Sequence, residues 1–262
     1  MDEAKSNIER KQPAKTLKEV VIAIKGLKKA FGEKAVLKGI NLELKRSENV
    51  VVLGRSGVGK SVAIQCIVGL LKPDGGSLKV FGDEVAGMSD RELKQLRIKT
   101  GFLFQSGALY DSMTVRENLE FPLTRVLKLK NQQEIDKRVE DALDSVGLLE
   151  AIDKLPSDLS GGMRKRAGLA RTIIVNPEII LYDEPTTGLD PITSREISHL
   201  ILRIQKKYKT SSIIITHDME CARIAADRIL IMDDGEFIAE GSFNELHKSK
   251  NKIVEEFFKD IL

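Results

Sequence analysis

Cysteine is scarce in this chain of 262 residues, and its two thiols, Cys66 and Cys221, lie far apart with no CxxC pair. This spacing excludes a disulfide scaffold and a zinc cluster, and we expect both residues to be small buried side chains. Long hydrophobic runs are also missing. The longest stretches without a charged residue, 61–71 and 100–110, have 11 residues each, whereas a bilayer span needs about 20. We therefore expect a chain that does not cross a membrane by itself.

A large excess of one charge is missing too. The chain has 42 Lys and Arg against 39 Asp and Glu, a net charge of +3 that is spread along the sequence, which argues against a dedicated nucleic-acid binder with a concentrated basic face. Residues 1–18 mix acidic and basic residues and hold no apolar segment, so they predict a polar cytoplasmic tail rather than a secretion signal or transit peptide. With 42% hydrophobic and 31% charged residues, the composition is that of a soluble globular protein.

Apolar runs rich in Val and Ile alternate with helical patterns. The runs are residues 20–24, 50–53, 179–182, 212–216 and 229–232. Because these runs do not alternate apolar and polar residues, they predict strands covered on both faces, hence a parallel α/β sheet. Asp190 and Pro191 offer an N-cap and a first-turn proline for a helix that packs on the sheet through Ile197, Leu200, Ile201 and Ile204.

The middle third of the chain has a different pattern. Ile135, Val139, Leu143 and Val146 form a helical stripe that ends at Gly147, and nothing resembling a strand occurs between about residues 106 and 176. We interpret residues 106–176 as a helical subdomain inserted between two segments of a core, 19–105 and 177–241. Residues 242–262 then form a C-terminal helical tail.

The strand predicted at residues 50–53 is followed at once by Gly54-Arg55-Ser56-Gly57-Val58-Gly59-Lys60-Ser61 and then by the apolar stretch 62–71. This is the G-x-x-x-x-G-K-[ST] pattern of a P-loop in the required strand, loop and helix setting. Its glycines let backbone N–H groups turn toward phosphate oxygens, and the helix that follows directs its positive dipole end at them. Lys60 adds a point charge and Ser61 a hydroxyl for Mg²⁺. The alternative is a glycine-rich turn without a ligand.

Two carboxylates, Asp183 and Glu184, follow the strand predicted at 179–182. Ligand groups gather at the carboxyl ends of parallel strands. Asp183 is therefore placed to hold Mg²⁺ and Glu184 to polarise the attacking water in nucleotide hydrolysis. Alone, an acidic pair at a strand end is a weak signal, since such pairs are usually solvated.

With Leu159-Ser160-Gly161-Gly162-Met163, the chain resembles the ATP-binding-cassette (ABC) ATPases, which carry an LSGGQ-like signature, from about residue 20 to residue 241. The resemblance implies an ABC nucleotide-binding domain: a P-loop NTPase core of the RecA-like α/β class with an antiparallel β subdomain and the inserted helical subdomain. It also implies ATP as substrate with Mg²⁺. The site residues that it adds are Phe31 stacking on adenine, Gln105 of the Q-loop touching Mg²⁺, Asp190 of the D-loop, and His217 hydrogen-bonded to the γ-phosphate. A core position for Phe31, a surface amide for Gln105 and a merely structural role for His217 are the alternatives.

Residues Ser160, Gly161 and Gly162 should open a helix over 163–174, whose N–H groups form a second anion site. One chain then has two anion sites and too little sheet to fold both onto one nucleotide. In the family, the signature of one copy closes over ATP held by the P-loop of another, so the resemblance implies a head-to-tail homodimer with two composite sites. A capping turn without a ligand is the alternative.

The stretch 103–123 and the signature helix resemble the Mla/Mce-associated branch, which energises lipid transport between the membranes of diderm bacteria. Met163 stands where most cassettes carry Gln, in keeping with this branch. The resemblance implies a peripheral protein at the cytoplasmic face of the inner membrane, with an MlaE-like permease docked near the Q-loop and an MCE-domain lipid-binding protein in the same complex. Residues 106–120 hold few charges and offer the docking surface, with these apolar candidates: Leu109, Tyr110, Met113 and Leu119. The alternative is ordinary core of the helical subdomain.

Other function classes fit less well. A soluble cassette ATPase acting on nucleic acid or ribosomes would be expected to carry a second P-loop, a coiled-coil insertion or a basic stripe, and the sequence has none of these. An ATP sensor without turnover would not need Glu184. Another transported substrate, such as an amino acid or a metal, stays open.

Overall fold

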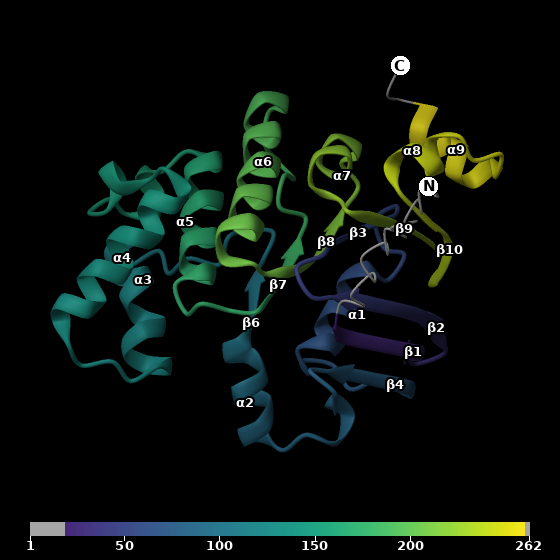
Figure 1. Cartoon of the computed structure of the whole chain (residues 1–262), viewed down its shortest axis with the longest axis horizontal. Coiled ribbons are helices and arrows are strands. Elements are labelled where there is room, and N and C mark those ends of the chain that lie inside the picture. Colours follow the sequence, from purple (N-terminus) through teal and green to yellow (C-terminus); the bar gives the residue numbers. More distant parts are fainter. Residues whose placement is uncertain (1–18, 260–262) are drawn as a thin grey trace, which may run out of the picture.

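The computed structural model describes residues 19–259. The predicted polar tail, residues 1–18, and the last three residues lie outside this range. The described chain forms two β-sheets with helices packed on and between them (Figure 1). The α/β fold class predicted above is confirmed by this arrangement.

The larger sheet has six strands in the order β10-β9-β3-β8-β7-β6. All neighbouring pairs are parallel except β9 and β10. Four of the five predicted runs become strands of this sheet. The strands are β3 (Asn49–Leu53), β6 (Thr100–Leu103), β7 (Ile179–Asp183), β8 (Ser211–Thr216), β9 (Arg228–Asp233) and β10 (Glu236–Gly241). The parallel strands therefore end at one edge, where the site lies.

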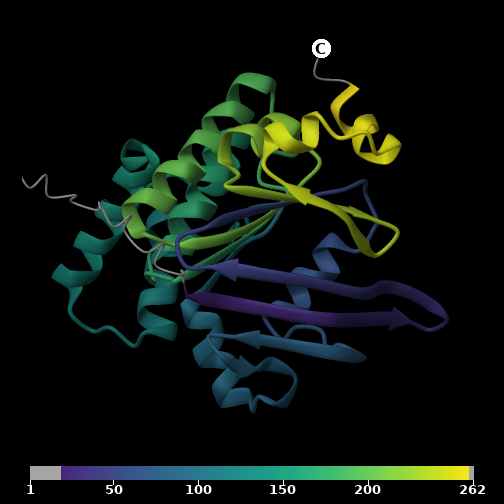
Figure 2. The same ribbon diagram turned by 45° about the vertical axis from the view of Figure 1, so that its right-hand side comes forward.

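The smaller sheet is antiparallel, with the order β2-β1-β4-β5 (Figure 2). Its strands are β1 (Val20–Phe31), β2 (Lys34–Lys45), β4 (Gly75–Val80) and β5 (Asp83–Glu84). The prediction that residues 20–24 join the parallel sheet was wrong. Only two residues separate β1 from β2, so the chain reverses directly and Phe31 pairs with Lys34 in a hairpin, whereas parallel neighbours need a long crossover.

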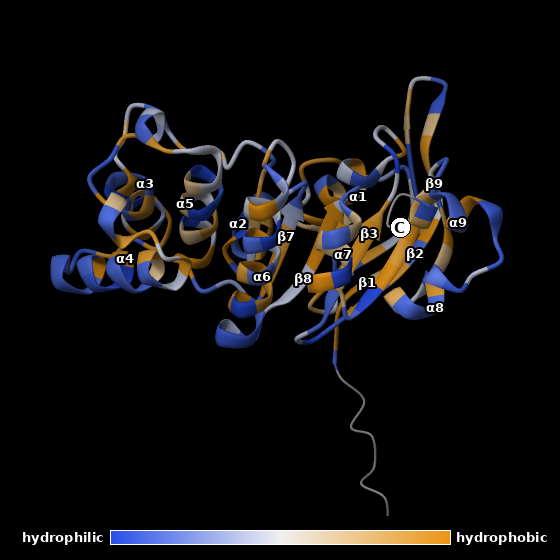
Figure 3. Cartoon of the chain, turned by 90° about the horizontal axis from the view of Figure 1, so that it is seen from above, coloured by the Kyte–Doolittle hydropathy of each residue, from blue (hydrophilic) through white to orange (hydrophobic). Residues whose placement is uncertain are grey.

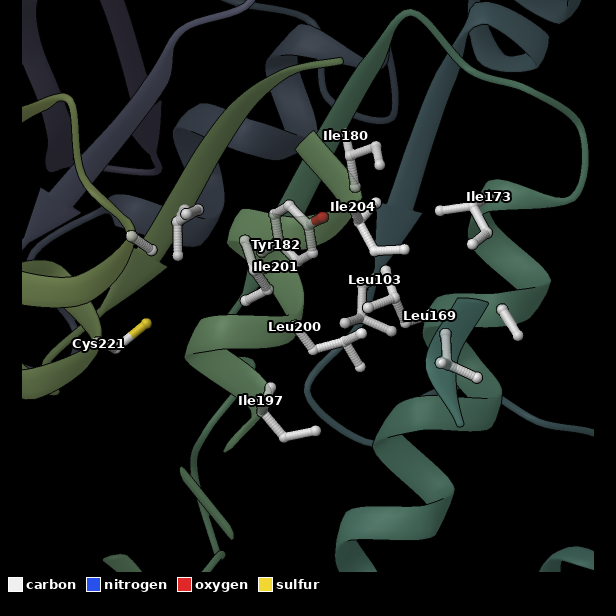
Figure 4. Close-up of a cluster of buried hydrophobic side chains, with 14 of the residues drawn as sticks. Leu103, Leu169, Ile173, Ile180, Tyr182, Ile197, Leu200, Ile201, Ile204 and Cys221 are labelled. Atoms are coloured by element: carbon white, nitrogen blue, oxygen red, sulfur yellow. The ribbon is translucent and has the colours of Figure 1, made fainter. Parts of the chain in front are cut away.

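Alternate residues of the parallel strands face two separate hydrophobic cores. Val51 and Tyr182 face a core formed with the helices α4 (Gln132–Val146), α5 (Gly161–Ile173), α6 (Pro191–Tyr208) and α7 (Met219–Ala225). Val50 and Leu181 face the core shared with α1 (Lys60–Ile67) and the antiparallel sheet. In Figure 4, Tyr182 lies among side chains of β6, α5 and α6, with Cys221 of α7 to one side. Cys66 and Cys221 are both buried free thiols, as predicted. Figure 3 shows the apolar strands between helices whose outer faces are polar.

Helices and turns fill the stretch between β6 and β7. They include α3 (Val115–Phe121), a π-helical turn (Pro122–Val126), α4 (Gln132–Val146) and α5 (Gly161–Ile173), and between residues 104 and 178, all of which are described, there is no strand. Helix α4 ends as predicted at Gly147, whose φ of 64° suits glycine. Helix α1 (Lys60–Ile67) is shorter than the predicted stretch 62–71, because the chain turns at Gly69, whose φ is +65°. Helix α2 (Asp90–Lys99) precedes β6.

Helix α6 (Pro191–Tyr208) begins after Asp190, whose side chain accepts hydrogen bonds from the N–H groups of Ile192 and Thr193, as predicted for an N-cap. It is followed by α7 (Met219–Ala225). The chain ends with α8 (Phe243–His247) and α9 (Lys252–Phe258), which pack on the domain through buried Leu246, Val254 and Phe258. None of the helices within residues 19–259 is long and apolar enough to span a bilayer. The division into subdomains and tails stays a prediction.

Candidate active site

A pocket of about 470 Å³ lies where β3, β7 and β8 end. The loop after β3 contributes Ser56, Gly57 and Gly59, and the start of α1 contributes Lys60, Ser61 and Val62. The ends of the other strands contribute the polar residues Gln105, Asp183, Glu184 and His217, together with Thr187. The parallel topology thus brings P-loop and acidic residues into one pocket although they are far apart in the sequence.

The backbone of the P-loop depends on glycine at two positions. Gly57 has a φ of +83° and Gly59 a φ of +108°, conformations that other residues rarely adopt. A Cβ atom on Gly59 would also lie 2.8 Å from the carbonyl oxygen of Val36. The loop can therefore turn its N–H groups toward a bound anion at the start of α1.

Lys60 is almost completely buried, with 5% of its side chain exposed. Its Nζ donates hydrogen bonds to the carbonyl oxygens of Gly54 at 2.6 Å and Arg55 at 2.9 Å, and lies 3.8 Å from Glu184 Oε1. Burial lowers the pKa of Lys60, and the carboxylates of Glu184 and Asp183 partly oppose this effect. The Lys60 ammonium group is thus held at the pocket by hydrogen bonds to carbonyl oxygens of the P-loop.

Ser61 and Asp183 form the pair expected to hold Mg²⁺. The Ser61 hydroxyl donates a hydrogen bond to Asp183 Oδ1 at 3.0 Å. Burial raises the pKa of Asp183, an effect that the Ser61 hydrogen bond opposes and the nearby Glu184 charge reinforces. A hydroxyl and a carboxylate are hard oxygen donors, which suit Mg²⁺ held jointly with substrate phosphates, so these residues fit the expected cation.

Glu184 is the most highly connected carboxylate of the pocket, and its side chain is 15% exposed. Its Oε2 accepts a hydrogen bond from the Thr187 hydroxyl at 3.0 Å and lies 2.9 Å from His217 Nδ1. The backbone φ of Glu184 is 50°, in the left-handed region that is uncommon for a residue other than glycine. This conformation and these contacts direct the carboxylate into the pocket instead of into solvent.

Some residues predicted to bind ATP do not line this pocket, including three residues of the P-loop. Gly54 and Arg55 contribute carbonyl oxygens to Lys60, while the Arg55 side chain extends to Glu256 of α9 at 2.6 Å. Val58 packs against the core shared with the antiparallel sheet. Phe31, at the end of β1, is 50% exposed, which excludes a core position and leaves adenine stacking as a prediction.

The signature residues and Asp190 also lie outside the pocket. Ser160 caps α5 and accepts a hydrogen bond from the N–H of Met163 at 3.3 Å, so the helix begins at Gly161, two residues before the predicted start. Asp190 is exposed at the start of α6. The start of α5, where the second anion site was predicted, is thus separate from the P-loop pocket within one chain.

Sequence reasoning missed three residues of the pocket: Val36, Thr187 and Val62, the last of which was predicted only as part of the helix after the P-loop. Val36 lies on β2, so only the packing of the antiparallel sheet against the P-loop brings it here. Thr187 contacts the Glu184 carboxylate from three residues away. The sequence Glu184-Pro185-Thr186-Thr187 could have indicated this contact, because a hydroxyl three positions after a carboxylate can reach it across a turn.

Comparison with known proteins identifies several relatives. The family model described as ABC transporter matches residues 37–187. The chain is 40% identical to the chloroplast protein TRIGALACTOSYLDIACYLGLYCEROL 3 of Arabidopsis thaliana, over 91% of this chain and 73% of that one. It is 36% identical to the intermembrane phospholipid transport system ATP-binding protein MlaF of Haemophilus influenzae, over 91% and 90%. It is also 39% identical to the methionine import ATP-binding protein MetN of Rhizobium johnstonii, over 85% and 61%.

Solved structures agree with these matches. One is a dimeric post-hydrolysis state of the ATP-binding cassette MJ0796 bound to ADP and Pi, with a TM-score of 0.77 and 33% identity over 85% of this chain and 98% of that one. Another is cbiO1 from Clostridium perfringens, part of the transporter complex cbiONQ, with a TM-score of 0.82 and 30% identity over 92% and 95%.

Proposed function

This chain belongs to the ABC transporter family as an ATP-hydrolysing subunit, and we propose that it drives phospholipid transport by a membrane permease. The observation that supports hydrolysis at the described pocket is the placement of Glu184, whose carboxylate lies 3.8 Å from Lys60 Nζ and 2.9 Å from His217 Nδ1. The lipid assignment is supported by the match to MlaF, which covers 90% of that protein.

In the proposed mechanism, the P-loop N–H groups and Lys60 hold the phosphates of ATP. Ser61 and Asp183 would hold Mg²⁺, with Gln105 as the further residue expected to approach it. When bound, the cation would supply positive charge beside the phosphate oxygens. Glu184 accepts a proton from the attacking water, and the contacts from Thr187 and His217 keep its carboxylate oriented. His217 is 61% exposed, so it can also reach the γ-phosphate of a bound nucleotide.

Two copies of the chain complete each site in this proposal. Ser160, Gly161 and Gly162 at the start of α5 lie outside the P-loop pocket of their own chain, which supports their closing over ATP held by a second copy. The dimeric state of the ADP-bound MJ0796 cassette supports the same arrangement. Asp190 and Phe31 are proposed to contact the nucleotide site in that assembly.

A mixing experiment tests the shared site. Chains with Lys60→Ala and chains with Ser160→Arg should each be inactive alone, because every composite site then has one defect. A mixed head-to-tail dimer has one site with both defects and one with neither. Return of ATPase activity on mixing is expected if one intact site turns over alone. Heterodimers that form without regaining activity would contradict independent composite sites.

An apolar groove supports permease docking near the Q-loop. The groove measures about 340 Å³ and is lined in part by Leu70, Phe104, Ala108, Val126 and Arg171. Three of these side chains are large, apolar and exposed, namely Leu70, Phe104 and Val126. Such an exposed apolar surface suits a short cytoplasmic helix of an MlaE-like permease.

The residues predicted for docking only partly fit this groove. Leu119 is fully buried in the core of the helical region, so its prediction as a docking residue was wrong: its side chain faces the core side of α3. Tyr110 is 42% exposed, and Arg171 of the groove lies 4.8 Å from its ring centroid. Leu109 packs against the core, and Met113 is half-buried.

Co-purification from native membranes tests the lipid assignment. We expect a permease, an MCE-domain protein and enriched phospholipid to accompany the chain, peripherally bound at the cytoplasmic face of an inner membrane. The match to the methionine importer subunit MetN supports the alternative substrate class. Recovery of an amino-acid or metal permease without enriched lipid would contradict lipid transport and leave ATP hydrolysis untouched.

A further inference from the structure

Lys165 joins two loops of the ATP site through a single ammonium group. It lies on α5, five positions after Ser160, and only 6% of the residue is exposed. Its Nζ donates hydrogen bonds to the carbonyl oxygen of Gln105 at 2.5 Å and to that of Glu184 at 3.0 Å. These acceptors follow β6 and β7, which are adjacent strands of the parallel sheet. One side chain of the signature helix therefore holds the backbone of two residues that line the pocket.

The environment of Lys165 is not that of an ordinary surface lysine. Within residues 19–259, no carboxylate lies within ion-pair distance of its Nζ. Burial lowers the pKa of Lys165, and the more distant Glu184 and Asp183 charges oppose this effect. A buried cation is costly unless it is well hydrogen-bonded, and here the compensating bonds go to the two loops.

The bond to Glu184 acts on the peptide that orients the proposed catalytic carboxylate. The Glu184 N–H donates a hydrogen bond to the carbonyl oxygen of Ile215 at 2.9 Å, and the Glu184 carbonyl accepts the bond from Lys165. The residue is thus held on both sides in its left-handed conformation, with a φ of 50°. Loss of one of these bonds would let the peptide rotate and carry the carboxylate with it.

We propose that Lys165 is a positioning residue that couples the signature helix to Gln105 and Glu184. When a nucleotide or a second copy of the chain displaces α5, the ammonium group transmits that displacement to the backbone of both residues. This inference rests on the proposed role of Glu184 as the group that accepts a proton from water. It predicts an effect on turnover rather than on ATP binding, because Lys165 does not line the pocket.

The test compares Lys165→Met, Lys165→Arg and the control Arg166→Met in the full-length chain. Arg166 is a cation on the same helix that bonds the Val146 carbonyl at 3.1 Å and Glu196 at 2.7 Å, away from the pocket. We expect Lys165→Met to lower kcat about 10- to 100-fold with ATP affinity within about threefold of the parent, as for a misplaced catalytic group. Lys165→Arg, which retains a cationic donor, and Arg166→Met should both stay within about threefold in kcat.

A Lys165→Met chain with kcat within about twofold of the parent, or with ATP affinity lost in proportion to kcat, would overturn the proposal. If that chain does not fold, Lys165→Ala, which likewise has no side-chain donor, is judged by the same criteria. Combining either variant with Glu184→Gln separates this inference from the proposed function. If Lys165 acts through Glu184, its substitution should add less than about threefold to the loss caused by Glu184→Gln. Fully additive losses of kcat in the double variant would overturn the coupling of Lys165 to Glu184. A Glu184→Gln chain with the kcat of the parent would instead refute the proposed role of Glu184.

Discussion

The Ser61 hydroxyl donates a hydrogen bond to Asp183 Oδ1 at 3.0 Å, although 122 positions separate the two residues in the sequence. Ser61 follows β3, and Asp183 is the last residue of β7. In the sheet, only β8 lies between these two strands. Because these strands are parallel, their carboxyl ends meet at one edge. The contact therefore joins the P-loop to the acidic pair and defines where Mg²⁺ is proposed to bind.

Replacing Ser61 tests the cation site. Ser61→Ala removes one of the oxygen donors, so the Mg²⁺ concentration required for half-maximal ATPase activity should rise by about tenfold or more. The measurement is a Mg²⁺ titration at saturating ATP. Ser77→Ala is the control, since the Ser77 hydroxyl bonds Glu84 in the antiparallel sheet. An unchanged Mg²⁺ requirement in Ser61→Ala would refute this assignment.

The two thiols should be unreactive in the folded chain. Burial raises the pKa of Cys66 to about 11 and that of Cys221 to about 12, so at about pH 8 the folded chain holds on the order of 10⁻³ thiolate or less at each. A thiol reagent should therefore label both residues only after unfolding in urea. The ordinary pKa of a cysteine thiol is 9.0, so the thiols of the unfolded chain ionise at lower pH than those of the folded chain. The free energy of unfolding should therefore fall as the pH rises from 9.0 toward 11. Rapid labelling of the native chain would contradict this burial.

Asp190 should stabilise α6 in a manner that depends on pH. Hydrogen bonds from Thr193 and Ile192 hold the pKa of Asp190 below its ordinary value of 3.8. The folded state therefore favours the ionised carboxylate. Its stabilisation of the folded chain is present above pH 3.8 and is lost as the pH falls through the lowered pKa. Asp190→Ala should lower Tm at about pH 7, and the difference from the parent should narrow toward about pH 3. The control is Asp190→Asn, which keeps an N-cap acceptor without the charge. A Tm difference between Asp190→Ala and the parent that does not change with pH would argue against a role for the Asp190 charge.

A charge placed in the apolar groove should weaken assembly with the permease. Val126→Asp introduces a carboxylate that docking would bury without a partner, so binding should weaken by a few kcal/mol. Leu149→Asp is a matched control, because Val126 and Leu149 are both 45% exposed but only Val126 lines the groove. Recovery of the permease in pull-downs and ATP affinity of the isolated chain provide the two readouts. Equal recovery with both variants would exclude the groove as the docking surface.

Much of the fold could be predicted because strong local patterns coincide with tertiary packing. Residues 50–53, 179–182 and 212–216 are apolar without alternation, and the structure buries alternate side chains of these strands in two different cores. The P-loop and the acidic pair were recognisable because their residue types and spacing have a direct chemical reason. Asp190 and Gly147 marked helix ends through capping, which depends on local sequence alone.

Features that depend on distant packing could not be predicted in this way. Residues 20–24 look like buried parallel strand, but the short hairpin after Phe31 places them in the antiparallel sheet. Nothing local in the sequence shows that Val36 lines the pocket or that the buried Lys165 bonds the Gln105 and Glu184 carbonyls. Leu119 seemed suitable for docking, yet the packing of α3 buries it.

The most direct test of the proposed catalytic role is the turnover of Glu184→Gln in the full-length chain. An amide cannot accept the proton of the attacking water as a carboxylate can, so kcat should fall by about 100-fold or more while ATP still binds and the ATP-bound dimer accumulates. The measurement combines steady-state phosphate release with ATP affinity and the dimer fraction on gel filtration. A kcat within about threefold of the parent would show that Glu184 does not carry the reaction.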